Sequence, residues 1–352
     1  MINVAIADDS PFTCKLLASY VEDGGECKVV GLAHDAQSTI ELIRRETPDV
    51  LTLDLQMPGG DGLDLLRQLA DEPRVSVVVI SGVTRLAAAT TLKALELGAV
   101  DFILKYTPGA PVSPATLRRE IIAKVKAAAA AHPARRAEPS TGSAAPLPLQ
   151  ATARTTARAA APRGVAGVVV VGASTGGPSA IGEFVAQLPA DFGAPCVIVQ
   201  HLPASFTAPF AAQLKRRAKV PVRVAEEGDR LEPGLVLVAP GAMHLAITSD
   251  GRVHLQTPAA KDFYRPSIDL AMASAAETYG ASAVGVVLTG IGNDGSEGLR
   301  HIRGAGGEAF IQDVASCIVP SMPERALQHA GADVVGTPER IGQILSSRRK
   351  PS

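Results

Sequence analysis

The stretch VVVVGASTGGPSA, residues 168–180, joins a run of valines to a glycine-rich turn and then to a proline. This order predicts a buried strand, a sharp turn and the first turn of a helix. Two phosphate-binding templates fail here: Pro178 stands where a P-loop needs lysine, and Ser174 stands where a dinucleotide fingerprint needs glycine. The segment does satisfy G-x-S-x-G, in which small neighbours expose a serine hydroxyl. A plain turn capped by Ser174 remains an open alternative.

A nucleophilic serine needs a base and an acid that orients the base. His201 is the histidine that directly follows a predicted parallel strand, APCVIVQ, the next strand after the one that carries Ser174. Asp294 lies in the loop IGNDGSEG after another strand, where glycines allow close backbone approach and their N–H groups could stabilise an oxyanion. Asp313 competes for the same role, whereas Asp269 looks like a residue inside a capped helix. We expect Ser174, His201 and Asp294 to meet at one edge of a sheet.

Both halves of the chain alternate short apolar runs with helical patterns, which predicts two parallel, doubly wound α/β domains. Predicted strands in the first half are 3–8, 27–33, 49–54, 75–81 and 101–105, closed by an amphipathic helix over 113–131. Those in the second half are 165–171, 195–200, 222–224, 235–239, 243–247, 252–256, 282–289 and 308–312. Residues 235–256 suggest a hairpin insertion, because SDGR supplies a turn.

Residues 132–163 separate these halves and are rich in Ala, Pro, Thr, Ser and Arg. They hold too few large apolar side chains to offset the entropy of ordering, and their prolines disfavour a helical connector. We expect a flexible linker between a domain over 1–125 and a second domain over 164–346.

Composition excludes several classes of protein. The formal net charge of −1 gives no bulk attraction to nucleic acid or to an anionic membrane. The cysteines are scattered without a C-x-x-C pair, which favours reduced, buried thiols over a zinc cage. The sequence also shows no signal peptide and no apolar run of membrane-spanning length. We expect a cytoplasmic monomer without direct membrane insertion.

Polar residues end four strands of the first half: Asp8 and Asp9, then Asp54, Ser81 and Lys105. Ligands gather at the carboxyl ends of parallel strands, so these groups should lie together. Crowded carboxylates need a cation, and an oxygen-only ligand set suits Mg²⁺. A single aspartate here would more often cap a helix, but the ordered set favours a phosphoryl-accepting site.

The first half resembles the receiver domain of bacterial two-component response regulators. The match rests on IADDSP, LTLDLQMPGGDGLDLL, VVVISG and GAVDFILK. It implies a flavodoxin-like fold, with Asp54 as the phosphoacceptor and Mg²⁺ held by Asp8, Asp9, Asp54 and the Gln56 carbonyl. It also implies that Ser81 and Lys105 sense the phosphoryl group and that Phe102 is the aromatic switch position.

The second half resembles the catalytic domain of the chemotaxis protein-glutamate methylesterase family. The matching pieces are VGASTGGPSA, VIVQHLP, APGAMHL, RPSIDLAMASAA, VVLTGIGNDGSEGL and IQDVASCIVPSMPERAL. The family's loop has Met where this chain has Ile291, a β-branched residue that can still donate its N–H.

This second resemblance implies hydrolysis of γ-glutamyl methyl esters on chemoreceptors, with deamidation of certain glutamines. Ser174 would be the nucleophile, His201 the base and Asp294 its partner, with Thr175 and Ile291 at the oxyanion loop. The esterase step would need no cofactor, and a chemotaxis histidine kinase would phosphorylate the receiver, which packs over the catalytic edge until then. The rivals are a DNA-binding output, disfavoured because no basic recognition helix is present, and a non-catalytic interaction module.

Overall fold

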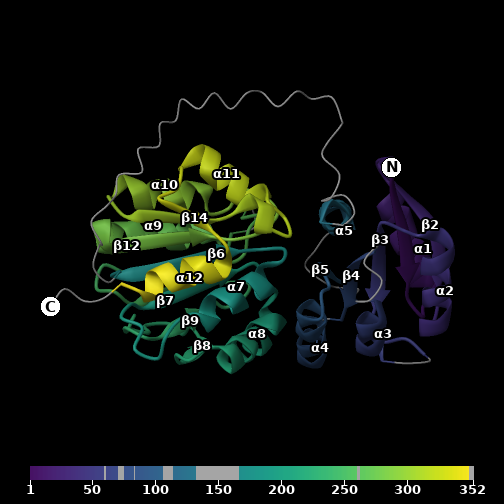
Figure 1. Cartoon of the computed structure of the whole chain (residues 1–352), viewed down its shortest axis with the longest axis horizontal. Coiled ribbons are helices and arrows are strands. Elements are labelled where there is room, and N and C mark those ends of the chain that lie inside the picture. The colour runs from purple at the N-terminus through teal and green to yellow at the C-terminus, as the bar shows by residue number, and fades with distance from the viewer. Residues whose placement is uncertain are drawn as a thin grey trace.

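The computed structural model describes residues 1–58, 61–69, 75–82, 84–105, 114–131, 166–259 and 262–348. The predicted linker at 132–163 lies outside them. The described residues form two α/β domains, each on its own parallel sheet (Figure 1). Among these residues no helix combines the length and the hydropathy needed to cross a bilayer. The four cysteines are free and buried, as the sequence predicted.

The first domain is a five-stranded parallel sheet in the order β2-β1-β3-β4-β5. The strands are β1 (Ile2–Ala7), β2 (Cys27–Ala33), β3 (Val50–Asp54), β4 (Ser76–Ser81) and β5 (Asp101–Leu104). The helices are α1 (Pro11–Glu22), α2 (Ala36–Glu46), α3 (Gly62–Leu69), α4 (Arg85–Glu96) and α5 (Pro114–Ala130). Successive β1 side chains alternate between the core under α1 and α5 and the core under the other helices, which explains the nearly continuous apolar strands.

The second domain has a seven-stranded parallel sheet in the order β14-β13-β12-β6-β7-β9-β8. Its strands are β6 (Val168–Ala173), β7 (Cys196–Gln200), β8 (Val222–Val224), β9 (Val236–Val238), β12 (Ala283–Val287), β13 (Glu308–Gln312) and β14 (Val334–Gly336). A separate antiparallel hairpin joins β10 (His244–Ile247) to β11 (Val253–Gln256).

Helices cover both faces of this second sheet (Figure 1). They are α7 (Gly177–Ala186), α8 (Ala204–Arg217), α9 (Ile268–Tyr279), α10 (Ser296–Gly304), α11 (Ser321–His329) and α12 (Pro338–Ser346). Val169 and Val171 of β6 share a core with α7, α8 and α12, while Val168 and Val170 share one with α9, α10 and α11. Two apolar faces on one strand again explain the uninterrupted valine run.

Two details of the predicted second domain were wrong. The segment 235–239 is not part of the hairpin insertion: β9 pairs in parallel with β7 and β8, and all its residues are buried, which suits a strand inside a parallel sheet. The edge strand β14 was missed because it is short and exposes Val335, so it lacks the apolar run that marks the other strands.

The two domains contact each other through β5 and α4 of the first and α7 and α8 of the second (Figure 1). The rings of Phe102 and Phe206 stack with centroids 4.3 Å apart and planes 8° apart. Where α4 and α8 end, a carboxylate oxygen of Glu96 lies 4.0 Å from Nε of Arg217. An aromatic stack with an ion pair beside it therefore joins the receiver-like domain to α8.

Phe184 is fully buried between the second sheet and α12, so its truncation should leave a cavity. We expect Phe184→Ala to lower the free energy of unfolding of this domain by about 3–5 kcal/mol. Hydrogen exchange of the β6 amides in the full chain measures this loss for the second domain alone. Val335→Ala, at a half-exposed position, is the control and should stay within about 0.5 kcal/mol of wild type. A change that small for Phe184→Ala would contradict the packing described.

Candidate functional site

The parallel register of β6 with its two neighbours brings three loops to one edge of the sheet. Ala173 is paired with Gln200, and the N–H of His201 donates to the carbonyl of Ala173 at 3.2 Å. On the other side of β6, the N–H of Ser174 donates to the carbonyl of Thr289 at 3.0 Å, just after β12. Ser174 and His201 therefore leave the sheet together, beside the loop that carries Asp294.

The turn after Ser174 is held by glycines that a side chain could not replace. Gly176 has φ +76° and is the N-cap residue of α7, with no side-chain hydrogen bond at this cap, so Ser174 does not serve as the cap that the sequence left open. A Cβ on Gly177 would lie 2.0 Å from the Gln200 side-chain oxygen. The amide of that glutamine donates to the carbonyls of Ser174, at 2.8 Å, and of His201, at 3.3 Å. Gln200 thus ties the two loops together.

His201 and Asp294 form a hydrogen-bonded pair, with 2.8 Å between Nε2 and Oδ2. The Asp294 carboxylate is almost fully buried and also accepts the N–H groups of Ile268, at 2.7 Å, and Asp269, at 2.9 Å. Burial favours the neutral acid, but the His201 ring and these two amides outweigh it and hold the pKa of Asp294 below its ordinary value. Asp294 is therefore an ionised partner for the ring. In the described part of the chain, no hydrogen bond joins the Ser174 hydroxyl to His201.

Asp313, the competing acid, instead accepts the N–H of Ala315 as the cap of a 3₁₀ turn over Val314–Ser316. Asp269 does lie in the first turn of α9, as its sequence suggested, yet it has a further contact that the sequence did not reveal. Its Oδ1 accepts the N–H groups of Gly295 and Gly298 at 2.8 and 2.7 Å, beside Asp294. Burial and the neighbouring Asp294 carboxylate raise the pKa of Asp269 to about 6.

Backbone donors around Ser174 differ from the sequence expectation. The glycine N–H groups near Asp294 are already used: Gly292 donates to the Ser321 hydroxyl and Gly295 donates to Asp269. Over the residues that the structure describes, the N–H groups of Thr175 and Ile291 have no hydrogen-bond partner. Both N–H groups are therefore available as donors in the loops around Ser174.

Thr175 also links the site to the first domain. Its buried hydroxyl donates to Oδ2 of Asp101, at the start of β5. Lys124 of α5 lies 3.5 Å from the other oxygen of Asp101 and donates to the Phe102 carbonyl at 2.6 Å. The residue next to Ser174 is thus held by a buried polar network of the receiver-like domain, a contact that no sequence pattern indicated.

Tyr264 is a second residue that the sequence analysis missed. Its ring stacks on the His201 ring, with centroids 5.0 Å apart and planes 16° apart. It comes from the segment between β11 and α9, where no periodic pattern predicted its position.

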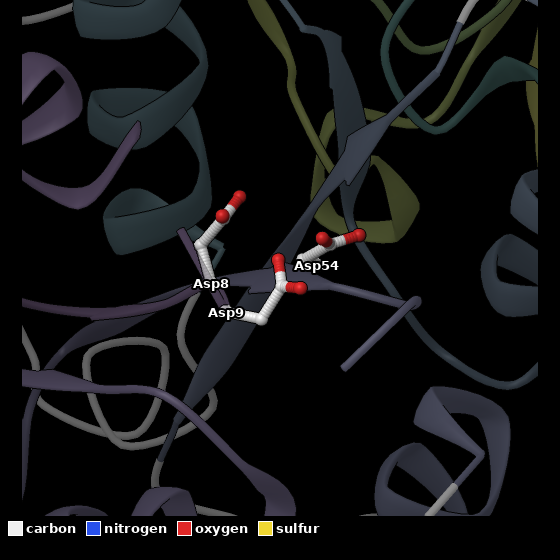
Figure 2. Close-up of side chains that lie close together, drawn as sticks. All are labelled: Asp8, Asp9 and Asp54. Carbon is white, nitrogen blue, oxygen red and sulfur yellow. The ribbon is translucent and has the colours of Figure 1, made fainter. Parts of the chain in front are cut away.

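The acidic residues of the first domain do meet, as expected. Asp8, Asp9 and Asp54 each place a carboxylate oxygen within 4.8 Å of the others, and Figure 2 shows their side chains close together. Nζ of Lys105 lies 2.5 Å from Asp54 and 3.2 Å from Asp8. Burial raises the pKa of Asp54 despite its hydrogen bonds from Lys105 and the N–H of Gln56.

This cluster fits a hard divalent cation. One oxygen of Asp8 is buried without a hydrogen-bond donor, although the Lys105 ammonium lies near it. Such an oxygen, together with two more carboxylates, is the ligand type that Mg²⁺ prefers. Ser81 is buried beside the cluster, but its hydroxyl lies 2.6 Å from the hydroxyl of Thr91 in α4 and is hydrogen-bonded to it.

The raised pKa of Asp269 predicts a pH dependence of stability. The folded state holds the Asp269 proton more tightly than the unfolded chain, so wild type should lose stability relative to Asp269→Asn as pH rises from about 4 to about 6. The free-energy difference should then stay constant at higher pH. Unfolding titrations of both proteins across this range measure it.

The control, Asp229→Asn, has the opposite sign. A hydrogen bond from Arg223 lowers the pKa of Asp229, so this variant should be less stable than wild type above about pH 4, with the difference shrinking in acid. A pH-independent difference between wild type and Asp269→Asn would contradict the buried carboxyl pair.

Comparison with known proteins agrees with both halves of this description. Residues 169–345 match the family model described as CheB methylesterase, and residues 4–119 match the response regulator receiver domain. A protein-glutamate methylesterase/protein-glutamine glutaminase of Oleidesulfovibrio alaskensis is 38% identical over 363 residues, covering 98% of each chain. One from Dechloromonas aromatica is 40% identical, covering 92% of this chain and 91% of that protein.

A solved structure gives the same result for the second domain. The Thermotoga maritima CheB methylesterase catalytic domain is 35% identical, with a TM-score of 0.50, and the match covers 51% of this chain and 97% of that one. The identity to the full-length relatives extends over almost the whole chain. This chain therefore belongs to the CheB methylesterase family, with a response regulator receiver domain ahead of its methylesterase domain.

Proposed function

We propose that this chain is a phosphorylation-activated hydrolase that removes methyl groups from glutamate methyl esters of chemoreceptors and deamidates specific receptor glutamines. The observation that supports the proposal is the His201–Asp294 hydrogen bond beside the turn of Ser174, where three neighbouring strands end. The names of its full-length relatives supply the two reactions, on protein glutamate methyl esters and on protein glutamines. The receptor as the protein substrate is what the family resemblance implies. The substrate would be the cytoplasmic part of the receptor, so the chain would act in the cytoplasm.

The geometry assigns a role to each member of the site. Nε2 of His201 is bonded to Asp294, so Nδ1 is the nitrogen that takes the Ser174 proton when the hydroxyl attacks the ester carbonyl. The missing hydrogen bond between Ser174 and His201 would form with substrate, since such bonds are often long in free enzymes. The N–H groups of Thr175 and Ile291 would hold the oxyanion, supported by the N-terminus of α7.

The reaction then divides into two acyl transfers. His201 returns the proton to the methoxy oxygen as its bond to the carbonyl carbon breaks, and methanol leaves. The same nitrogen next deprotonates a water molecule, which attacks the glutamyl ester of Ser174. The bond from the carbonyl carbon to Oγ of Ser174 then breaks, His201 returns the proton to Oγ, and the glutamate carboxylate leaves. With a glutamine substrate, the first leaving group is ammonia. This chemistry requires no cofactor.

In the receiver domain, Asp54 would accept a phosphoryl group from a chemotaxis histidine kinase. Asp8, Asp9, Asp54 and the Gln56 carbonyl would hold Mg²⁺, which neutralises charge on the phosphoryl oxygens. Lys105 already contacts Asp54 and would pair with the new charge, while Ser81 would leave Thr91 to donate to it. Because Thr91 belongs to α4, this exchange would loosen a helix that contacts the second domain.

The contact between the domains supports control by occlusion. Asp101 binds the residue next to Ser174, and Phe102 stacks on Phe206, which follows His201 by five positions. A receptor segment could not reach Ser174 while the receiver stays there. Phosphorylation would shift the population of this closed state, and the linker at 132–163, between domains at 1–125 and 164–346, would allow the parts to separate.

Methanol release from methylated receptor fragments tests the nucleophile and the switch together. Wild type should release methanol faster with a small-molecule phosphodonor, whereas Ser174→Ala should lose activity by about 10³-fold or more. Ser179→Ala, on the first turn of α7, is the matched control and should keep its activity. Asp54→Asn should give the same rate with and without phosphodonor. No release from any wild-type preparation would favour a non-catalytic interaction module.

Charge reversal at the domain contact tests occlusion directly. Arg217→Glu places a carboxylate opposite Glu96, so it should raise the methanol release of the unphosphorylated chain several-fold. The double variant Glu96→Lys with Arg217→Glu restores opposite charges and should return the rate toward wild type. Equal rates of methanol release from unphosphorylated wild type and Arg217→Glu would argue that this interface does not inhibit the esterase.

A further inference from the structure

The catalytic histidine is held by more than its carboxylate partner. Asp294 bonds the edge of the His201 ring, while the ring of Tyr264 lies nearly parallel to its face, with centroids 5.0 Å apart. A hydrogen bond at one nitrogen still leaves the imidazole some freedom to tilt about its side-chain torsions. A stacked ring restricts this freedom, because tilting would separate the two faces.

The hydroxyl of the same tyrosine holds the neighbouring loop. It donates to Oδ1 of Asn293 at 3.0 Å and accepts the N–H of Asn293 at 3.3 Å. Asn293 directly precedes Asp294, and Ile291 lies two positions before it. The Tyr264 hydroxyl therefore helps to fix the loop that carries both Asp294 and the proposed oxyanion donor Ile291.

The loop is shaped around this hydroxyl. Gly292 has φ +105°, and a Cβ there would lie 2.2 Å from the Tyr264 oxygen, so only glycine fits. Burial, with the nearby Asp294 and Asp269 carboxylates, raises the pKa of Tyr264. The phenol therefore keeps its proton and remains a donor to Asn293 at working pH.

From these contacts we infer that Tyr264 is a positioning residue of the esterase site, joining the base to the loop of the acid through its ring and its hydroxyl. This inference rests on the proposed function. Tyr264 acts through His201 and Asn293, so its removal should lower the rate of the chemical step and leave substrate binding intact. Misplacement by a fraction of an ångström is enough to slow an acyl transfer.

Separate variants distinguish the ring from the hydroxyl. Tyr264→Phe keeps the stack and loses both bonds to Asn293, and we expect kcat for methanol release to fall roughly tenfold with KM within about twofold of wild type. Tyr264→Leu loses the stack as well and should fall roughly 100-fold. Tyr279→Phe is the control, because its hydroxyl makes no hydrogen bond within the described residues, and it should match wild type.

A double-mutant cycle separates positioning from a general structural role. Asn293→Ala removes the acceptor of the Tyr264 hydroxyl, so combining it with Tyr264→Phe should slow the enzyme no further than the slower single variant. Independent, multiplying losses would overturn the inference. So would a Tyr264→Phe enzyme at the wild-type rate, or one whose KM rises while kcat is kept, since that pattern means contact with substrate.

A fluorophosphonate labels Ser174 without a methyl ester substrate. Its labelling rate, measured on the same full-length proteins with phosphodonor present, separates the positioning role of Tyr264 from the proposed esterase function. Slower labelling in Tyr264→Phe than in Tyr279→Phe supports the positioning role even if methyl esters prove not to be substrates. Equal labelling rates overturn it, whatever the methanol assay gives. A wild-type chain that neither releases methanol nor takes the label overturns both proposals.

Discussion

The pairing of β6 with β7 on one side and β12 on the other is the constraint on which the second domain depends. Parallel strands end at the same edge, so a fixed register fixes which loops meet there. Ala173 opposite Gln200 sets Ser174 beside His201, and Gly172 opposite Val287 sets the same turn beside the loop of Asp294. No residue with a side chain fits in place of Gly172, because a Cβ would lie 2.3 Å from the Ile268 side chain. The close packing of β6, β7 and β12 therefore sets which side chains lie together at the site.

The two domains use buried carboxylates in contrasting ways. Asp294 accepts two backbone N–H groups and a histidine, which together outweigh burial and keep it ionised. Asp54 has fewer donors, and burial raises its pKa even with Lys105 in contact. A carboxylate with many fixed donors is a good partner for a base, whereas one with fewer donors keeps room to accept a new group and a metal ion.

Much of this arrangement could be predicted from the sequence. Strand ends in apolar runs are clear signals. The sequence therefore indicated that Asp8, Asp9 and Asp54 lie together on one sheet, and that His201 lies near Asp294 on the other, with Ser174 on the neighbouring strand end. Their catalytic and phosphoryl-transfer roles stay predictions. What escaped the sequence depends on tertiary contact. Tyr264 lies in a segment without periodicity, and Asp269 resembles an ordinary first-turn helix residue until α10 packs against it.

Through the bond between Thr175 and Asp101, the receiver domain holds a hydroxyl that lies next to Ser174. In the proposed closed state, a receptor segment and the receiver compete for the same surface around Ser174. Binding equilibria that exclude each other are linked, so whatever weakens receiver docking strengthens receptor binding. A high local concentration of receptors would then favour the open state, which phosphorylation also favours. The concentration of substrate would act on the switch, as well as the kinase.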